Sequence, residues 1–113
     1  MISKNSKVKR KTNRIICDYI MNPHLIDGLK YDLRLYVLVT SYDPLRIYLY
    51  DEGLTRFATE KYTTNTKEVT KRYVHLTNYS VNKHAKKFIK NTNSENDGEG
   101  SKWSHTALRA KYT

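Results

Sequence analysis

Residues 25–62 read LIDGLKYDLRLYVLVTSYDPLRIYLYDEGLTRFATEKY, and this stretch predicts most of the fold. Tyr31 to Ser41 is a run of β-branched, leucine and tyrosine residues, a composition typical of a pleated and largely buried strand. Asp43-Pro44 predicts a turn, because Asp bonds its own downstream backbone and Pro fixes the next φ. Leu45 to Tyr50 then alternates between two faces and predicts a returning strand.

The same stretch predicts a third strand. Asp51-Glu52-Gly53 has the composition of a second tight turn, with Gly53 able to take a positive φ. Leu54 to Glu60 follows as another strand-forming segment. We therefore expect an antiparallel meander of three strands.

Two arginines lie inside these predicted strands, Arg34 and Arg56. A guanidinium on a well-packed strand needs a paired anion, because an unpaired buried charge is very costly. One interpretation is an ion pair with Asp32, Asp51 or Glu52, or an arginine on the open face of the sheet. The other is a cleft in which both arginines bind phosphate or carboxylate, for which the planar fork of donors is suited.

Two later segments, HLTNYSVNKHAKKF at residues 75–88 and GSKW at residues 100–103, follow this stretch. Together the three segments resemble the tubulin–tyrosine ligase-like family, specifically its polyglutamylase branch, from about Ile15 to the C-terminus. The resemblance implies an α+β chain: the central antiparallel sheet portion of an ATP-grasp fold with a short C-terminal helix, incomplete. It also implies an enzyme that uses ATP to join glutamate to protein carboxylates.

Length and charge set wider bounds. The chain has 113 residues, enough for one small domain, and 21 basic against 11 acidic residues give a net charge of +10. This balance indicates an anionic partner, and on charge alone nucleic acid, an anionic membrane and an acidic protein tail all stay open. No apolar run is long enough to span a bilayer, and the apolar core of a signal peptide is absent.

Cys17 is the only cysteine, so an intrachain disulfide and a cysteine-only metal site are excluded, and a reducing, cytosolic setting fits. We expect Cys17 to be a small buried hydrophobe rather than a nucleophile. Four scattered histidines without ligand spacing do not predict a zinc site, and no residue is predicted to bind a metal. His75 is expected to be a packed, hydrogen-bonded histidine rather than a general base.

The N-terminal 14 residues are polar and basic and predict a disordered segment, with a nucleic-acid arm or a localisation signal as the alternative. Residues 15–113 are expected to form a partial ligase-like domain. Ile15 to Met21 predicts a short buried strand that ends at Asn22-Pro23. The resemblance implies that this segment is the hinge that meets adenine, where Tyr19 and Ile20 agree with the family while Cys17 and Asp18 depart from it.

Lys30, Asp32 and Arg34 alternate, which places all three on one face of a strand, where they can also satisfy one another. The resemblance implies that Lys30 and Asp32 approach the nucleotide and that Arg34 meets the acceptor's carboxylate or phosphate. Arg56 is implied as a second such donor. An acyl-phosphate route must hold two anions together, so fixed positive donors are needed to offset their repulsion.

Residues 74–80, VHLTNYS, predict a strand end with turn residues when the local pattern alone is considered. The resemblance implies instead that Thr77 and Asn78 line the nucleotide site. It places Tyr79 and Ser80 beside the incoming amino acid, and this pair favours the glutamate-adding branch over the tyrosine-adding one.

The C-terminal part is mostly polar. Residues 62–72 predict a loop, residues 81–90 either a short basic helix or a solvated surface, and residues 91–100 a flexible loop. Ser101 is expected to cap a helix that runs through Trp103 to Ala110. Lys102 lies in that predicted first turn. The resemblance implies that Lys102 donates to the carboxylate of the amino-acid substrate, and the alternative is an exposed lysine.

The family's carboxylate and asparagine ligands for Mg²⁺ do not follow Lys102, and its upstream lobe does not precede the hinge. ATP and Mg²⁺ are the implied cofactors, and phosphoryl transfer depends on metal-assisted charge neutralisation. We therefore expect the central slice of a ligase, nearly inert alone: a fragment, a partial gene model or a degenerate relative.

Two functional hypotheses follow. The first is an ATP-dependent ligase that adds glutamate to the acidic C-terminal tail of tubulin, in the cytoplasm, at the cytoskeleton or in a cilium or flagellum. The second is a non-catalytic basic module that binds tubulin or microtubules. A nucleic-acid binder ranks third, because ten tyrosines suit base stacking but no nucleic-acid motif is recognisable.

Overall fold

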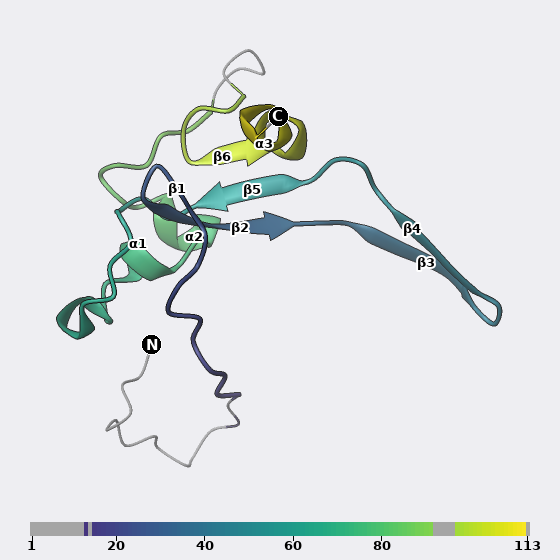
Figure 1. The fold of residues 1–113 in the computed structure, drawn as a ribbon, viewed down its shortest axis with the longest axis horizontal. Helices are drawn as coiled ribbons and strands as arrows, with labels where there is room; N and C mark the ends of the chain where they lie inside the picture. The colour runs from purple at the N-terminus through teal and green to yellow at the C-terminus, as the bar shows by residue number, and fades with distance from the viewer. Residues whose placement is uncertain (1–12, 14, 92–96, 113) are drawn as a thin grey trace.

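The computed structural model describes residues 13, 15–91 and 97–112, and these form an α+β fold with a curled antiparallel sheet. The main sheet has four strands in the order β1 (Leu25–Ile26), β2 (Leu29–Arg34), β5 (Leu54–Phe57) and β6 (Lys102–Ser104). A separate pair, β3 (Val37–Tyr42) and β4 (Leu45–Leu49), extends away from it (Figure 1). We call this pair the ribbon.

A two-residue turn joins β1 to β2. Asp27 and Gly28 both have positive φ, 51° and 74°, as the tightest hairpin turns require. The turn sets the register in which Ile26 pairs with Leu29 and Leu25 with Lys30. Asp-Gly is a strong hairpin signal, so the sequence contains a pattern for this strand pair, which lies outside the predicted three-stranded meander.

The predicted three-stranded meander is wrong. β3 and β4 pair with each other around the predicted Asp43-Pro44 turn, which is confirmed, but β5 returns to pair with β2 rather than with β4. A backbone hydrogen bond from Tyr50 N to Tyr36 O, 3.0 Å long, links the β2–β5 ladder to the β3–β4 ladder. The chain therefore makes one long hairpin, in which β2 and β3 lead outward and β4 and β5 lead back.

Gly53 explains why the chain passes so directly from β4 into β5. A Cβ atom at this position would lie 2.5 Å from the backbone oxygen of Arg34. Gly53 does not have the positive φ that was expected of it. Glycine is needed here because the two backbones approach closely, not because a tight turn needs a left-handed residue.

The ribbon is exposed, so the expectation that Tyr31 to Ser41 is largely buried is wrong for its outer part. Nearly every ribbon residue is exposed, and large apolar side chains such as Leu38 (61%) and Ile47 (55%) remain accessible. A two-stranded ladder has no further layer to bury its faces, and β-branched composition does not supply one.

The core lies on one face of the main sheet. Phe57 and Trp103, on neighbouring strands, have ring centroids 4.6 Å apart, and Ile26 and Leu108 complete the buried cluster. Leu108 belongs to α3 (His105–Tyr112), which covers this face of the sheet (Figure 1). The buried face is thus closed by one helix.

The helix begins later than predicted. Lys102 and Trp103 lie on β6, not in a helix, and Ser104 rather than Ser101 is the N-cap residue. The Ser104 hydroxyl accepts a hydrogen bond from Ala107 N at 2.9 Å, the third helical position, as an N-cap does. Cross-strand pairing with β5 holds residues 102–104 extended despite the helical pattern.

Two short helices, α1 (Arg72–His75) and α2 (Tyr79–Asn82), replace the strand end predicted at residues 74–80. The loop predicted for residues 62–72 contains η1 (Thr66–Glu68) and the first residue of α1, and is otherwise confirmed. Because α2 ends at Asn82, residues 83–90 form turns and mostly exposed surface, and no helix spans residues 81–90. Residues 92–96 of the predicted flexible loop lie outside the described part.

Asn82 fixes these helices to the sheet. Its side chain is 1% exposed; Oδ1 accepts bonds from Thr59 N and Thr59 Oγ1, at 3.2 and 2.9 Å. Its Nδ2 donates to Leu76 O and Asn78 O, at 2.7 and 3.1 Å. This buried side-chain amide thus accepts two hydrogen bonds and donates two, which satisfies all of its donors and acceptors. It therefore fixes the conformation of the connection between α1 and α2.

Three expectations concern the N-terminal residues: a buried strand at residues 15–21, a buried Cys17 and a disordered segment at residues 1–14. Residues 15–21 form no strand and are mostly exposed, so the buried strand predicted there is wrong, and Cys17 is exposed rather than buried. The predicted disordered segment, residues 1–14, lies outside the described residues except for Asn13. Within the described part of the chain, no helix has the length and apolar character needed to cross a membrane.

Candidate functional site

The face of the main sheet opposite α3 carries charged side chains. The register places Asp32 opposite Arg56, and Arg56 opposite Lys102, in one row across β2, β5 and β6. Directly opposed residues share a face, and residues two apart on a strand do so too. Lys30 and Arg34 therefore lie on this face beside the row. We call these five residues the polar face.

Asp32 and Arg56 form an ion pair at the centre of the row. Arg56 Nε donates to Asp32 Oδ1 at 3.0 Å, and Arg56 Nη2 contacts Asp32 Oδ2. This two-point geometry is the strong form of the arginine–carboxylate interaction. The interpretation of an ion pair with Asp32 is confirmed for Arg56. Arg34 is exposed, and the described residues give it no ion pair.

The surroundings keep Asp32 ionised. Burial alone would raise the pKa of Asp32, but hydrogen bonds from Arg56 and Thr77, with the charges of Arg56 and Arg34, outweigh it and lower that pKa. The hydrogen bond with Asp32 in turn raises the pKa of Arg56. Since the one carboxylate is shared with Arg56, the charges of Lys30, Arg34 and Lys102 are left to attract an external anion.

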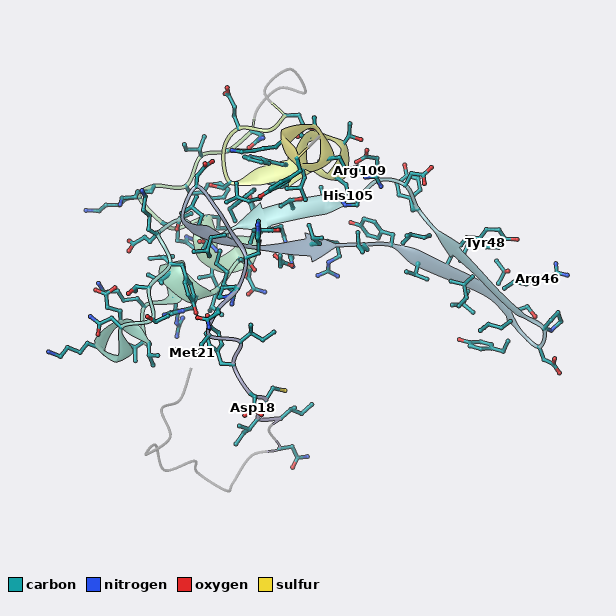
Figure 2. All side chains as sticks on the ribbon, viewed as in Figure 1. Asp18, Met21, Arg46, Tyr48, His105 and Arg109 are labelled. Atoms are coloured by element: carbon teal, nitrogen blue, oxygen red, sulfur yellow. The ribbon has the colours of Figure 1, made fainter. Side chains whose placement is uncertain are left out.

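Tyr19 brings residues 15–21, which we call the N-terminal segment from here on, to the polar face. Lys30 Nζ donates to Tyr19 Oη at 3.2 Å, and the ammonium lies 4.6 Å from the Tyr19 ring centroid. The next residue, Ile20, is 74% exposed and makes no comparable contact. Figure 2 shows the neighbouring Asp18 and Met21 on the same extended segment, which approaches the sheet from below.

His75 lies behind Tyr19 and is 4% exposed. Its Nδ1 is 3.0 Å from Tyr19 Oη, and its Nε2 is 3.3 Å from the backbone oxygen of Glu68. The prediction of a packed, hydrogen-bonded histidine is confirmed. Burial lowers the pKa of His75, and the charge of Lys30 adds to this. When the pH falls below about 6.5, His75 binds a proton in the unfolded chain before it does so in the folded chain. The free energy of unfolding therefore decreases as the pH falls below about 6.5.

Tyr62 completes this cluster, and sequence reasoning gave it no role. Its hydroxyl donates to Met21 O at 2.8 Å, and its ring lies edge-on to His75, with centroids 5.6 Å apart. Burial and the neighbouring Tyr19 hydroxyl raise the pKa of Tyr62 to about 12, so it stays a neutral donor. Tyr62 and Met21 are 41 residues apart, and no local pattern links them.

The remaining predicted residues lie beside the polar face or away from it. Thr77 contacts Asp32 and so joins the site. Asn78 precedes α2, while Tyr79 and Ser80 lie on its exposed first turn. The Tyr79 ring packs edge-on to Phe88, with centroids 5.8 Å apart, and has Lys83 Nζ above it at 5.9 Å. The structure shows no contact between these three residues and the charged row.

This arrangement fits an anion better than a metal ion. Ammonium and guanidinium groups on a rigid sheet are suitable donors to phosphate or carboxylate oxygens. Within the described residues, no group of three or more histidine, cysteine, aspartate or glutamate side chains lies together. Asp32 is the one carboxylate of the polar face and is engaged with Arg56. The described side chains therefore do not form a Mg²⁺ site.

Known proteins are similar to this sequence. Residues 1–113 match the tubulin-tyrosine ligase family. Tubulin polyglutamylase TTLL5 of Mus musculus is 47% identical over 108 residues, which are 96% of this chain and 8% of that protein. Tubulin polyglutamylase TTLL7 of Mus musculus is 49% identical over 103 residues, 90% of this chain and 11% of that protein.

A third relative carries a different name. Tubulin monoglutamylase TTLL4 of Mus musculus is 45% identical over 108 residues, 96% of this chain and 9% of that protein. The chain thus spans about a tenth of the length of these relatives. The match nevertheless covers both the polar face and the cluster of Tyr19, His75 and Tyr62.

Proposed function

This chain belongs to the tubulin-tyrosine ligase family, and we propose that it supplies the substrate-facing sheet of an ATP-dependent ligase that adds glutamate to tubulin carboxylates. The observation that carries the proposal is the polar face, where Lys30, Arg34 and Lys102 surround the Asp32–Arg56 pair on one side of a sheet. The names of the relatives, tubulin polyglutamylase and tubulin monoglutamylase, support the choice of tubulin as the substrate.

The roles divide along the sheet. Lys30, with Asp32, Thr77 and Asn78, faces the nucleotide, and the backbone of Tyr19 and Ile20 meets adenine. Arg34 binds the acceptor carboxylate, with Arg56 held by Asp32 as the second fixed donor. A further set binds the incoming glutamate: Tyr79, Ser80 and Lys102. This division places cations where anions must meet, which lowers the repulsion that opposes their approach.

ATP fits the donor chemistry of the polar face, and when bound it supplies the phosphoryl group that activates a carboxylate. The chain's own residues bind and orient the anionic groups. Mg²⁺ does not fit the described residues, and no step of the proposal depends on it. The fold that these roles require is the ATP-grasp arrangement, of which this sheet is the central part.

The acceptor in this proposal is the acidic C-terminal tail of tubulin. A net charge of +10 favours encounter with an acidic peptide and makes that encounter sensitive to salt. The proposed setting is therefore the cytoskeleton, including the microtubules of cilia or flagella.

A transplantation experiment tests the ligase proposal. The 108 aligned residues of mouse TTLL5 are replaced by those of this chain, and tubulin is incubated with the chimaera, ATP, Mg²⁺ and glutamate. We expect mass spectrometry to detect glutamate-sized additions. Arg34→Ala in the chimaera should reduce their rate by about 100-fold or more, as loss of a fixed charge-stabilising donor does.

Arg46→Ala is the matched control. Arg46 is an exposed arginine on the ribbon, remote from the polar face (Figure 2). We expect this variant to keep full activity. A folded but inactive chimaera, or equal losses for Arg34→Ala and Arg46→Ala, would contradict the proposal.

A non-catalytic tubulin-binding module is the second candidate, favoured by the lack of a metal-binding cluster among the described residues together with the basic charge. Mass spectrometry of tubulin incubated with the 113-residue chain itself separates the two. Tubulin that binds this chain and gains no glutamate, together with an inactive chimaera, would support the module.

A further inference from the structure

His75 is a buried titratable residue that the proposed ligand contacts leave unused. It is the last residue of α1 and contacts two other parts of the chain, the N-terminal segment through Tyr19 and η1 through Glu68. Two hydrogen bonds, both to the Tyr19 hydroxyl, link His75 to Lys30. Its position suggests a role that is exerted through that lysine.

The donor and the acceptor of each hydrogen bond that links Glu68, His75, Tyr19 and Lys30 follow from the chemistry of these groups. The Glu68 backbone oxygen can only accept, so His75 Nε2 carries the proton and donates to it. Burial keeps the ring neutral, and Nδ1 therefore holds a lone pair. The Tyr19 hydroxyl then donates to Nδ1, which leaves the oxygen's own lone pairs for Lys30.

We propose that Tyr19 and His75 are positioning residues that hold the Lys30 ammonium at the polar face, with its other N–H donors left for an anionic ligand. The proposal rests on the proposed function, since it takes Lys30 as the residue that faces the nucleotide phosphates. A lysine has four flexible side-chain bonds, and fixing its end before binding removes part of the entropy that binding would otherwise lose.

A second contact supports this assignment. The Tyr62 hydroxyl fixes Met21 O, two residues after Tyr19, and the Tyr62 ring packs against His75. The N-terminal segment is therefore tied down at two points close to Lys30, although it forms no strand. Without these ties an exposed segment has no reason to keep Tyr19 in place.

The groups that face His75 are Tyr19, Tyr62, Lys30 and Glu68, whose backbone oxygen accepts from Nε2 and whose negative charge acts to raise the pKa of His75. Protonation would turn Nδ1 into a donor, reverse its bond with Tyr19 and add a second positive charge near Lys30. The two hydrogen bonds that connect His75 to Lys30 through Tyr19 therefore require the neutral ring of His75.

A double-mutant cycle on the 113-residue chain tests the proposal, with inorganic triphosphate and ATP as probes. Tyr19→Phe removes the hydroxyl and keeps the ring, and we expect it to weaken binding about 3- to 10-fold, the effect of losing one ordinary hydrogen bond within the protein. Lys30→Met should weaken binding further. In the Lys30→Met background, Tyr19→Phe should then have no additional effect, because Tyr19 acts through Lys30.

Nitrogen NMR of His75 gives a readout that does not depend on binding. We expect a neutral ring protonated at Nε2 at neutral pH, and a change of the Nδ1 resonance in Tyr19→Phe. Independent, additive effects of the two substitutions on binding, or a proton on Nδ1, would overturn the positioning role. If Lys30→Met leaves triphosphate and ATP binding unchanged, the nucleotide role of Lys30 in the proposed function fails as well.

The outcomes separate the two proposals. If Lys30→Met weakens binding and Tyr19→Phe binds as the native chain does, the proposed function stands and the positioning role of Tyr19 and His75 is refuted. Thr64→Ala, at an exposed loop position, serves as the control and should match the native chain in both measurements.

Discussion

Gly53 illustrates how one residue without a side chain shapes the path of the long hairpin. The Arg34 backbone oxygen occupies the space that a Cβ atom at residue 53 would need. Since Arg34 is a proposed acceptor-binding residue, the close approach couples the shape of the hairpin to the site. A methyl group here would have to push β2 away from β5.

We expect Gly53→Ala to reduce the free energy of unfolding by about 1–3 kcal/mol, the usual effect of overpacking at a site that cannot relax. Urea unfolding of the chain measures it. Asp51→Ala, two residues earlier and exposed, is the control and should change stability by less than about 0.5 kcal/mol. Equal unfolding midpoints for the two variants would show that the close approach is not a constraint.

Single residues also mark the limit of sequence reasoning about the site. Alternation placed Lys30, Asp32 and Arg34 on one face, and the structure agrees. The two interpretations of the arginines stayed open because the choice depends on which strand lies next to β2. The contact between Tyr19 and His75 joins residues 56 apart, so no local pattern contains it.

The helix α3 is capped from two directions. Ser104 is its N-cap, and the Thr106 hydroxyl donates to the Glu52 carboxylate, whose pKa this hydrogen bond lowers. The carboxylate also lies near the positive end of the helix dipole. These contacts tie α3 to the segment that leads into β5.

Ser104→Ala should lower stability by about 1 kcal/mol, because Ala107 N loses its partner. Hydrogen exchange should be faster at the first amides of α3. Ser101→Ala removes the hydroxyl that was expected from sequence to cap the helix, and in the structure that hydroxyl instead accepts from Ile89 N. Faster exchange at the start of α3 in Ser101→Ala than in Ser104→Ala would contradict the assignment.

The elements show which parts of the fold are local. Composition located strand-forming segments within residues 31–60, and the Asp43-Pro44 turn was correctly predicted. Pairing was wrong because composition does not say which strand is the neighbour, and the ladder changes between Arg34 and Val37. Ser101 was mistaken for the cap because the helical pattern starts before residues that pairing with β5 holds extended.

At the scale of the whole molecule, the ribbon is the part that the rest of the described chain does not cover. Its exposed apolar side chains and open strand edges are features that promote association between chains. The four-stranded sheet differs, because α3 covers its apolar face.

We expect the native chain to associate increasingly as its concentration rises, and Leu38→Lys combined with Tyr48→Glu to reduce this. These residues are direct cross-strand partners, so opposite charges preserve the pairing while they remove apolar surface. Sedimentation velocity measures the effect. Thr64→Glu with Thr70→Lys introduces the same charges at exposed loop positions and should leave association unchanged. A ribbon variant that associates as strongly as this control would exclude the ribbon as the cause.

Trp103 is the only tryptophan in the sequence. Its ring packs on Phe57 and lies 5.2 Å from Lys111 Nζ, while its neighbour Lys102 points to the polar face. Indole fluorescence therefore comes from one position, between the helix and the charged row. Its emission gives an unlabelled optical signal for the unfolding of the core, and for ligands that shift β6.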